Sequence, residues 1–301
     1  MYKPLVPELA LFFLTLLWGT TFTLVKLALA TASTGVFLTA RFAVACAVLG
    51  AVMLVRRDRA GGREFWRHGI ILGLLMLAGF IFQTLGLGYT TPARSGFITG
   101  LCVLIVPFIA RFTLGRPVRW SVWVGVALAV VGLLLLTRPF DAGAVTAAVR
   151  FGDFITLFSA VAYAVQITFM SEWSERHPLV PFTLVQVAVT LLGVLVMVPI
   201  EGARWDPAGA STFAGVVAFT GVVMTAGAFF VMNWAQRHTS AVRAALIYAL
   251  EPVAAAIFSQ LVIGEELGAA GWTGGGLIVA GVLVGELAGA WSGRATEPAQ
   301  T

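Results

Sequence analysis

The sequence has few charged residues. Asp, Glu, Lys and Arg make up 11% of its 301 residues, whereas hydrophobic residues make up 59%. Such a composition leaves far too little polar surface to coat a soluble globule of this length. The mean hydropathy of +0.94 agrees with this interpretation. We therefore expect an integral membrane protein that has the lipid bilayer as its solvent.

Motifs that support enzyme or metal chemistry are also missing. The two cysteines, Cys46 and Cys102, lie within apolar segments, so the sequence has no disulfide framework and no CxxC metal or redox motif. No GxxxxGKS/T phosphate loop occurs, so the chain has no ATPase motif. No nucleophile, base and orienting group combine into a catalytic trio. We expect no enzyme activity, no cofactor and no bound metal.

The sequence does contain long apolar runs, which are bounded by charged residues or by proline and glycine. A helix needs about 20 such residues to cross a hydrocarbon core of about 30 Å. The connections between the runs are too short for a soluble domain. The prediction is an all-α integral membrane protein with ten transmembrane helices, over residues 8–28, 34–55, 69–89, 94–114, 120–137, 152–171, 180–200, 211–235, 241–263 and 271–290.

The two halves of the chain are related by a repeat. Five helices in each half is an odd number, so the second copy must enter the membrane from the opposite side. Inverted repeats are a feature of transporters, in which exchanging the roles of the halves exposes one site to each side in turn. Duplication also builds channels and passive scaffolds. The repeat is seen as identical residues 149 positions apart, at Thr90 and Thr239, Arg94 and Arg243, Gly115 and Gly264, Trp123 and Trp272, Gly125 and Gly274, and Gly132 and Gly281.

Domain organisation and orientation follow from the repeat and the loop charges. The first repeat is expected over 1–137, a connecting loop over 138–150, the second repeat over 151–290 and a tail over 291–301. Lys and Arg in short loops favour the cytoplasmic side. Their distribution places both termini, including the tail, in the cytoplasm. We interpret the net charge of +5 as a topology signal and expect no nucleic-acid partner.

Prolines interrupt two equivalent helices. Pro252 lies near the middle of the ninth predicted span and Pro107 lies inside the fourth, its repeat partner. Proline removes one backbone hydrogen bond and clashes with the carbonyl one turn earlier, so both residues are predicted helix breaks. Broken helices at corresponding places in two inverted halves indicate a substrate site near the bilayer midplane.

Glu251 precedes Pro252 directly, within an apolar run. An acidic group at the bilayer centre costs at least about 2.5 kcal/mol unless it faces protein or water. Two roles stay open. Glu251 could carry a proton or contact a substrate amine, or it could be a neutral acid that satisfies backbone groups freed by the proline.

Three cations lie in the outer half of the predicted spans. They are Lys26, Arg41 and Arg94, of which Arg41 is the deepest. They could form a cationic region that attracts a carboxylate, or they could extend to the outer headgroups.

Polar and aromatic side chains within the spans are candidates for the wall of a central cavity. Polar residues in spans also join helices to one another, and aromatic residues in membranes mostly pack against neighbours. An aromatic wall would suit apolar or aromatic solutes, including cations. The candidates are Trp18, Phe22, Arg41, Phe80, Gln83, Tyr163, Gln166, Asn233, Tyr248 and Glu251.

Glycines predict close helix contacts in the last span of each half, at Gly125 and Gly132 and at Gly281, Gly285 and Gly289, which recur every four residues. The sequence leaves open whether these contacts lie within one chain or between two copies in a homodimer.

Four segments carry a family resemblance. They are "LLWGTTFTLVK" (16–26), "ARF" (40–42), and residues 95–136 and 245–287, the last containing Glu251 and Pro252. Together they resemble the two EamA repeats of the drug/metabolite transporter superfamily. The resemblance implies a ten-helix, inverted-repeat transporter of bacterial inner membranes, often an exporter of amino acids or related metabolites. The chain is similar to aromatic amino acid exporters and also to members whose substrate is unknown.

Two functions follow as hypotheses. In the first, the protein is a secondary transporter that exports amino acids, with hydrophobic or aromatic side chains favoured, or related small metabolites. In the second, it is a multidrug or lipophilic-cation exporter that exchanges its substrate for protons at Glu251. A membrane scaffold without transport is a weaker third option. Small-molecule substrates and the bilayer are the expected partners in the first two cases.

Overall fold

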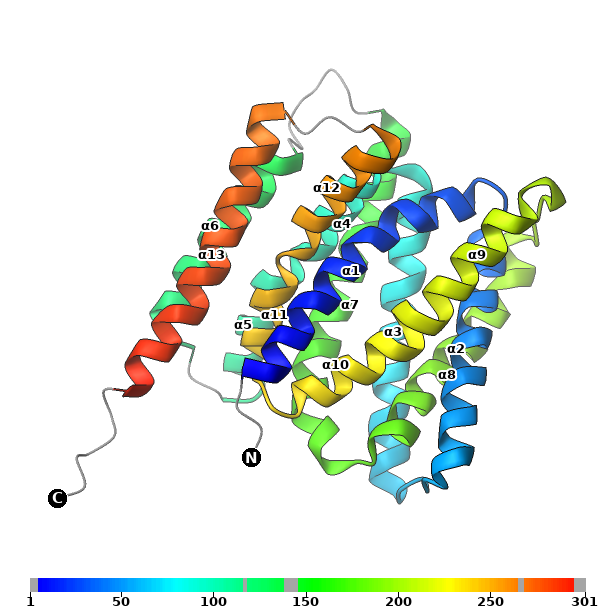
Figure 1. The fold of residues 1–301 in the computed structure, drawn as a ribbon, viewed down its shortest axis with the longest axis horizontal. Helices are drawn as coiled ribbons and strands as arrows, with labels where there is room; N and C mark the ends of the chain where they lie inside the picture. The colour runs from blue at the N-terminus through cyan, green and yellow to red at the C-terminus, as the bar shows by residue number, and fades with distance from the viewer. Residues whose placement is uncertain (1–4, 116–117, 138–145, 265–267, 295–301) are drawn as a thin grey trace.

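The computed structural model describes residues 5–115, 118–137, 146–264 and 268–294, and these are almost entirely helical (Figure 1). Apolar segments in lipid must satisfy their backbone groups internally, and a helix does this within one segment. The α-helices are α1 Leu5–Leu29, α2 Thr34–Arg56, α3 Arg63–Tyr89, α4 Pro92–Gly100, α5 Cys102–Phe112, α6 Trp120–Thr137, α7 Ala147–Trp173, α8 Leu179–Glu201, α9 Ala210–Gly221, α10 Ala228–Gln236, α11 Ala241–Tyr248, α12 Glu251–Ile263 and α13 Gly268–Arg294. Three short helices join them, η1 Ser174–Arg176, η2 Pro207–Gly209 and the π-helix η3 Val222–Gly227.

The predicted all-α membrane fold is confirmed. Within the described residues, eight helical segments are long and apolar enough to cross a membrane, and 120–135 is a shorter apolar helix. Helix also covers each of the predicted runs. The count of ten crossings stays a prediction. The predicted domain boundaries are likewise untested, because 138–145 and 295–301 lie outside the described residues.

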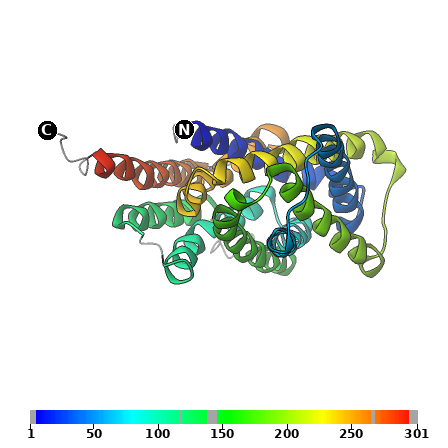
Figure 2. The ribbon, with the colours of Figure 1, turned by 90° about the horizontal axis from the view of Figure 1, so that it is seen from below.

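The two halves interlock. Helix α1 of the first half packs on α12 and α10 of the second, while α7 of the second half packs on α3, α4 and α5 of the first. Helix α2 packs on α8. At one edge of the bundle α6 and α13 lie side by side (Figures 1 and 2). The first helix of each half, α1 or α7, thus packs against the helices of the other half. This exchange encloses a central space between the two halves.

The two halves have helix breaks at equivalent positions. The break in the first half, however, does not lie at Pro107, where it was predicted. Helices α4 and α5 are separated at Leu101, and α11 and α12 are separated at residues 249–250, so Leu101 and Leu250 are 149 positions apart. Pro252 lies in the first turn of α12, as predicted. The prediction for Pro107 was wrong, because this residue lies inside α5.

The physical reason for the earlier break lies in the contact between the two interrupted helices. A Cβ on Gly100 would stand only 2.7 Å from Cγ of Pro252, so the first break faces the proline of the second half. The interruption at Leu101 therefore forms where the two halves meet, one residue after the glycine that allows the contact.

Two ion pairs join the halves at opposite ends of α1. Arg94 at the start of α4 pairs with Asp153 of α7, which also accepts a 2.7 Å hydrogen bond from Thr90 Oγ1. Arg243 of α11 pairs with Glu8 of α1 at 2.9 Å. The two arginines are equivalent in the repeat. Glu8 lies in the first turn of α1, whereas Lys26, in its last turn, donates to the carbonyl of Thr90, the residue whose hydroxyl binds Asp153. The two ion pairs therefore lie at opposite ends of the bundle.

A histidine pair closes the α7–α8 connection onto α3. His68 Nδ1 lies 2.9 Å from Nε2 of His177, and the His68 ring stacks on Trp173 at 4.2 Å between centroids. Burial lowers the pKa of His177, and the nearby Arg176 and Arg237 lower it further while Glu64 opposes them. A hydrogen bond between two imidazoles needs one unprotonated nitrogen as acceptor. At least one of the two imidazoles is therefore neutral in this contact.

The glycines of the last helix in each half are used within the chain. A Cβ on Gly132 of α6 would clash with the carbonyl oxygen of Gly274 in α13, and a Cβ on Gly281 would stand 2.5 Å from the carbonyl oxygen of Gly125. The contact is reciprocal between repeat-equivalent residues. The close contacts predicted at Gly125, Gly132 and Gly281 thus occur between α6 and α13, while the side of the helix at Gly285 and Gly289 lies outside what the structure describes. A homodimer stays an untested prediction.

We predict that Gly132→Ala destabilises the protein by about 1–3 kcal/mol, because the added methyl group overpacks the α6–α13 contact. Thermal unfolding in detergent would show a lower Tm. Gly276→Ala on α13 is the matched control, since a Cβ there meets nothing within 4 Å. Equal Tm values for the two variants would contradict the packing.

A second prediction concerns the partly buried ion pair. We expect Arg94→Gln to cost about 1–3 kcal/mol, because it leaves Asp153 without its charged partner. Arg176→Gln breaks an exposed pair with Glu172 and should cost less than about 1 kcal/mol. Unfolding of Arg94→Gln, Asp153→Asn and the double variant would measure the coupling, and strict additivity would refute it.

Candidate functional site

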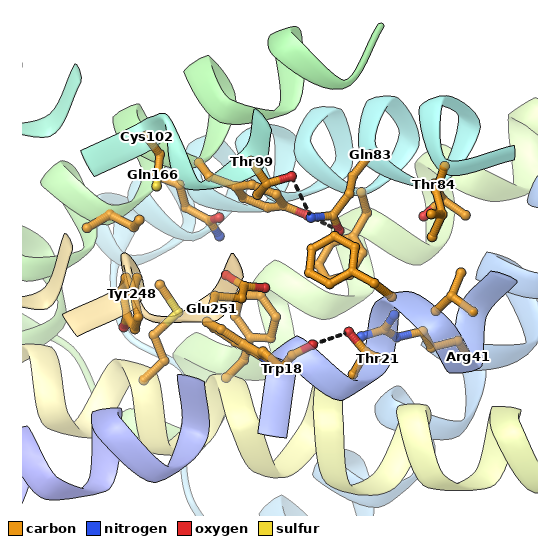
Figure 3. A pocket seen from close by; sticks show the side chains of 18 residues that line it. Trp18, Thr21, Arg41, Gln83, Thr84, Thr99, Cys102, Gln166, Tyr248 and Glu251 are labelled. Atoms are coloured by element: carbon orange, nitrogen blue, oxygen red, sulfur yellow. Dashed lines mark hydrogen bonds between the residues drawn. The ribbon is translucent and has the colours of Figure 1, made fainter. Parts of the chain in front are cut away.

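A cavity of about 60 Å³ lies between the two halves, next to the helix break before Glu251. This volume has room for a few water molecules. Its wall combines aromatic and apolar side chains with a few polar ones (Figure 3). Nine of the ten predicted cavity residues line it, namely Trp18, Phe22, Arg41, Phe80, Gln83, Tyr163, Gln166, Tyr248 and Glu251.

Asn233 is the exception. It is fully buried, and its Oδ1 accepts hydrogen bonds from Ser174 Oγ at 3.2 Å and from Gln186 Nε2 at 3.3 Å. Met232 lines the cavity, and the next residue is turned by about 100° around the helix axis, toward α8. Asn233 therefore joins α10 to α8 and η1. Its assignment to this cavity was wrong.

The helix break presents Glu251 to the cavity. The residue begins α12, and Pro252 is tolerated in this first turn because its missing N–H has no intrahelical partner there. Within the described part of the chain, no hydrogen bond or ion pair to the Glu251 carboxyl group is found. The proposed bonds to backbone groups freed by the proline are thus not seen, and the acid faces the cavity.

Aromatic rings surround this acid. The ring of Trp18 lies 5.7 Å from those of both Tyr248 and Phe229, and Phe80 lies 5.9 Å from both Phe229 and Tyr163. The Trp18 indole N–H donates to the carbonyl of Met224 in η3, at 3.2 Å. These contacts fix the rings, so the wall is rigid and aromatic.

Three polar groups form a chain along one wall. Tyr163 donates its hydroxyl to Gln83 Oε1 at 3.3 Å, and Gln83 Nε2 donates to Thr99 Oγ1 at 3.1 Å (Figure 3). This chain fixes the orientation of the Gln83 amide. It links α7 of the second half to α3 and α4 of the first across the cavity.

The three outer cations have separate fates. Lys26 donates to the carbonyl oxygens of Leu87, Gly88 and Thr90 at 2.7–3.0 Å and so caps the end of α3. Arg94 pairs with Asp153. Neither lines the central cavity, so the predicted cationic region is reduced there to Arg41.

Several residues of the wall were not predicted from sequence. Thr225 belongs to η3 and binds Arg41, while Phe229 and Met232 follow it on α10 and line the cavity. Phe229 and Met232 are three residues apart, so a common helix face could have indicated them. Thr99 and Cys102 flank the Leu101 break, whose position no proline marks.

Comparison with known proteins matches this architecture to a family. A model of the EamA-like transporter family matches residues 6–138 and again 150–285. An uncharacterized transporter of Archaeoglobus fulgidus is 30% identical over 283 residues, which cover 94% of this chain and 86% of that protein. The uncharacterized inner membrane transporter YedA of Escherichia coli K12 is 24% identical, over 94% of this chain and 92% of its own.

A solved crystal structure shares the fold. It superposes with a TM-score of 0.74 at 21% identity and covers 95% of this chain and 98% of its own. The family model thus matches the chain twice, once in each half. The chain therefore belongs to the EamA-like transporter family of the drug/metabolite transporter superfamily, and it is a multi-pass membrane transporter.

Proposed function

We propose that the protein exports amino acids with hydrophobic or aromatic side chains, or closely related metabolites, across the inner membrane by alternating access. The observation that carries this proposal is the placement of Glu251. Its carboxyl group has no protein partner within the described residues and faces a cavity walled by Trp18, Tyr248 and Phe229. An acid beside aromatic faces is a setting that attracts an ammonium group.

The rest of the wall suits an apolar side chain. Phe22, Val25, Leu87, Ile167 and Met232 add aliphatic and aromatic surface around the same space. Apolar burial contributes affinity without direction, while a few polar groups set orientation. An amino acid with a large apolar side chain fits both parts of the wall, because its ammonium group can meet Glu251 and its side chain can meet the apolar residues.

Alternating access is supported by the equivalent helix breaks. Leu101 and Leu250 interrupt corresponding helices of the two halves, and Pro252 meets Gly100 beside the cavity. Broken helices at a repeat interface form the midplane sites of inverted-repeat transporters. We propose that both termini are cytoplasmic, that the bilayer is the inner membrane, and that an ion or solute gradient, protons included, drives export.

A lipophilic cation is the second candidate substrate, and the same observation favours it. A partnerless acid in an aromatic cavity could hold a drug-like cation in one half-cycle and a proton in the other. Such a proton antiporter would need no group that recognises a carboxylate. The two functions therefore differ in one requirement: an amino acid exporter needs a group in the cavity that binds a carboxylate, and a lipophilic-cation antiporter does not.

Solute counterflow tests the proposal directly. Liposomes containing the purified protein would be loaded with one unlabelled amino acid and scored for entry of the same labelled compound, beside empty liposomes. We expect accumulation of phenylalanine, tryptophan or leucine and none of aspartate or lysine. Silence toward amino acids together with exchange of lipophilic cations would establish the second function, and silence toward both would favour a scaffold.

Glu251→Gln should raise the KM for counterflow of a hydrophobic amino acid by at least about tenfold, because it removes a charge-assisted hydrogen bond to the ammonium group. Glu175→Gln, on the exposed turn η1, is the control for loss of one acid. A Glu251→Gln variant that keeps its Tm and its KM would remove Glu251 from substrate binding.

A further inference from the structure

Arg41 is a deeply buried cation at the wall of the central cavity. Its side chain lies on α2, is only 4% exposed and lines the central cavity. Within the described residues, no carboxylate pairs with it. A charge at this depth is costly unless it faces a partner or water. The cavity is the one side of the residue from which such a partner could arrive.

The guanidinium is held with only part of its donor capacity used. Its Nε donates to Thr225 Oγ1 at 2.7 Å, and its central carbon lies 4.7 Å from the centroid of the Phe80 ring. A guanidinium has five N–H donors, and the four on its two terminal nitrogens have no partner among the described residues. Two of these donors, one on each nitrogen, fit the two oxygens of a carboxylate.

The π-helix explains why Thr225 is available to hold this group. Helix η3 interrupts the α-helical pattern between α9 and α10, and π-turns inside helices are frequent at functional sites. The Thr225 hydroxyl donates to the carbonyl of Thr220, five residues earlier, at 2.9 Å. Its oxygen is thereby oriented to accept from Arg41. Thr225 positions the guanidinium, while the plane of Phe80 covers one of its faces.

Glu251 and Arg41 lie apart around the same cavity and do not pair with each other (Figure 3). Trp18, Phe80 and Tyr163 line the cavity along with them. The cavity has an acid at one place and a cation at another, and neither is paired within the described residues. With the acid ionised, this arrangement is complementary to a zwitterion. It is not complementary to a simple cation, because Arg41 would repel it.

We propose that Arg41, positioned by Thr225, is a carboxylate-binding subsite, and that the substrate carries a carboxylate as well as an ammonium group. This inference rests on the proposed function and narrows it. Amines, amides and esters of hydrophobic amino acids should be poor substrates. The subsite also separates the two candidate functions, since a lipophilic-cation antiporter has no use for it.

Binding of two half-ligands to two variants tests the subsite without relying on transport. Phenylpropionate has the carboxylate and the ring but no amine, and phenethylamine has the amine and the ring but no carboxylate. Calorimetry on the detergent-solubilised full-length protein would measure both Kd values for wild type, Arg41→Gln and Glu251→Gln. We expect Arg41→Gln to weaken phenylpropionate by at least about tenfold and to leave phenethylamine unchanged or tighter, with the reverse for Glu251→Gln.

Two further variants separate positioning from folding. Arg41→Lys keeps the charge but not the two-pronged geometry, so it should restore only part of the phenylpropionate affinity. Thr225→Val should weaken phenylpropionate and leave phenethylamine unchanged. Thr273→Val is the matched control, since Thr273 lies on α13 away from the cavity and its hydroxyl also donates to a carbonyl of its own helix, and it should change neither. The Tm of each variant identifies any that fails to fold.

The outcomes separate the subsite from the proposed function. Equal loss of both half-ligands in Arg41→Gln, equal retention of both, or no phenylpropionate binding by the wild type would each overturn the subsite. Selective loss of phenylpropionate without phenylalanine counterflow by the wild type would uphold the subsite and overturn amino acid export. The transported solute would then be another carboxylate.

Discussion

The close packing around the second helix break is the constraint on which the site depends. Gly19, Gly96 and Gly100 let α1 and α4 approach the start of α12 to distances that side chains would prevent. Pro252 prevents α11 and α12 from forming one continuous helix, so α12 begins at Glu251 inside the bundle. Without the break the acid would lie on a continuous helix, and without the glycines the neighbouring helices could not enclose it.

Three other deep polar side chains named as candidates are held by bonds within the protein. Lys26 caps a helix end, Arg94 finds an aspartate, and Asn233 joins three elements through side-chain and backbone bonds. These groups stabilise the frame and have nothing left to offer a solute. Arg41 and Glu251 differ from them because each is an ionisable group at the cavity wall without a charged partner among the described residues. In a low-dielectric interior, hydrogen bonds between these groups and a ligand that enters the cavity are stronger than they would be in water.

Much of this could be read from the sequence, because apolar length and residue spacing report directly on helices and repeats. The 149-residue offset indicated the two halves. Trp18, Tyr248 and Glu251 were candidates for the cavity because they lie deep within predicted spans, and all three line it. Side-chain partners across helices could not be read. Whether Arg94 or Arg41 remained unpaired depended on Asp153 lying near one and not the other, and the π-helix behind Thr225 has no sequence signal.

The reciprocal glycine contact between α6 and α13 has a bearing on how such a chain arose. Gly132 meets the backbone at Gly274 and Gly281 meets it at Gly125, so each repeat presents the same surface to the other. A self-complementary surface of this kind is what a symmetric dimer requires. A single repeat inserted in both orientations would be able to pair with its copy through this same contact. The two copies differ at the site itself, where Glu251 of one repeat has Cys102 as its equivalent in the other.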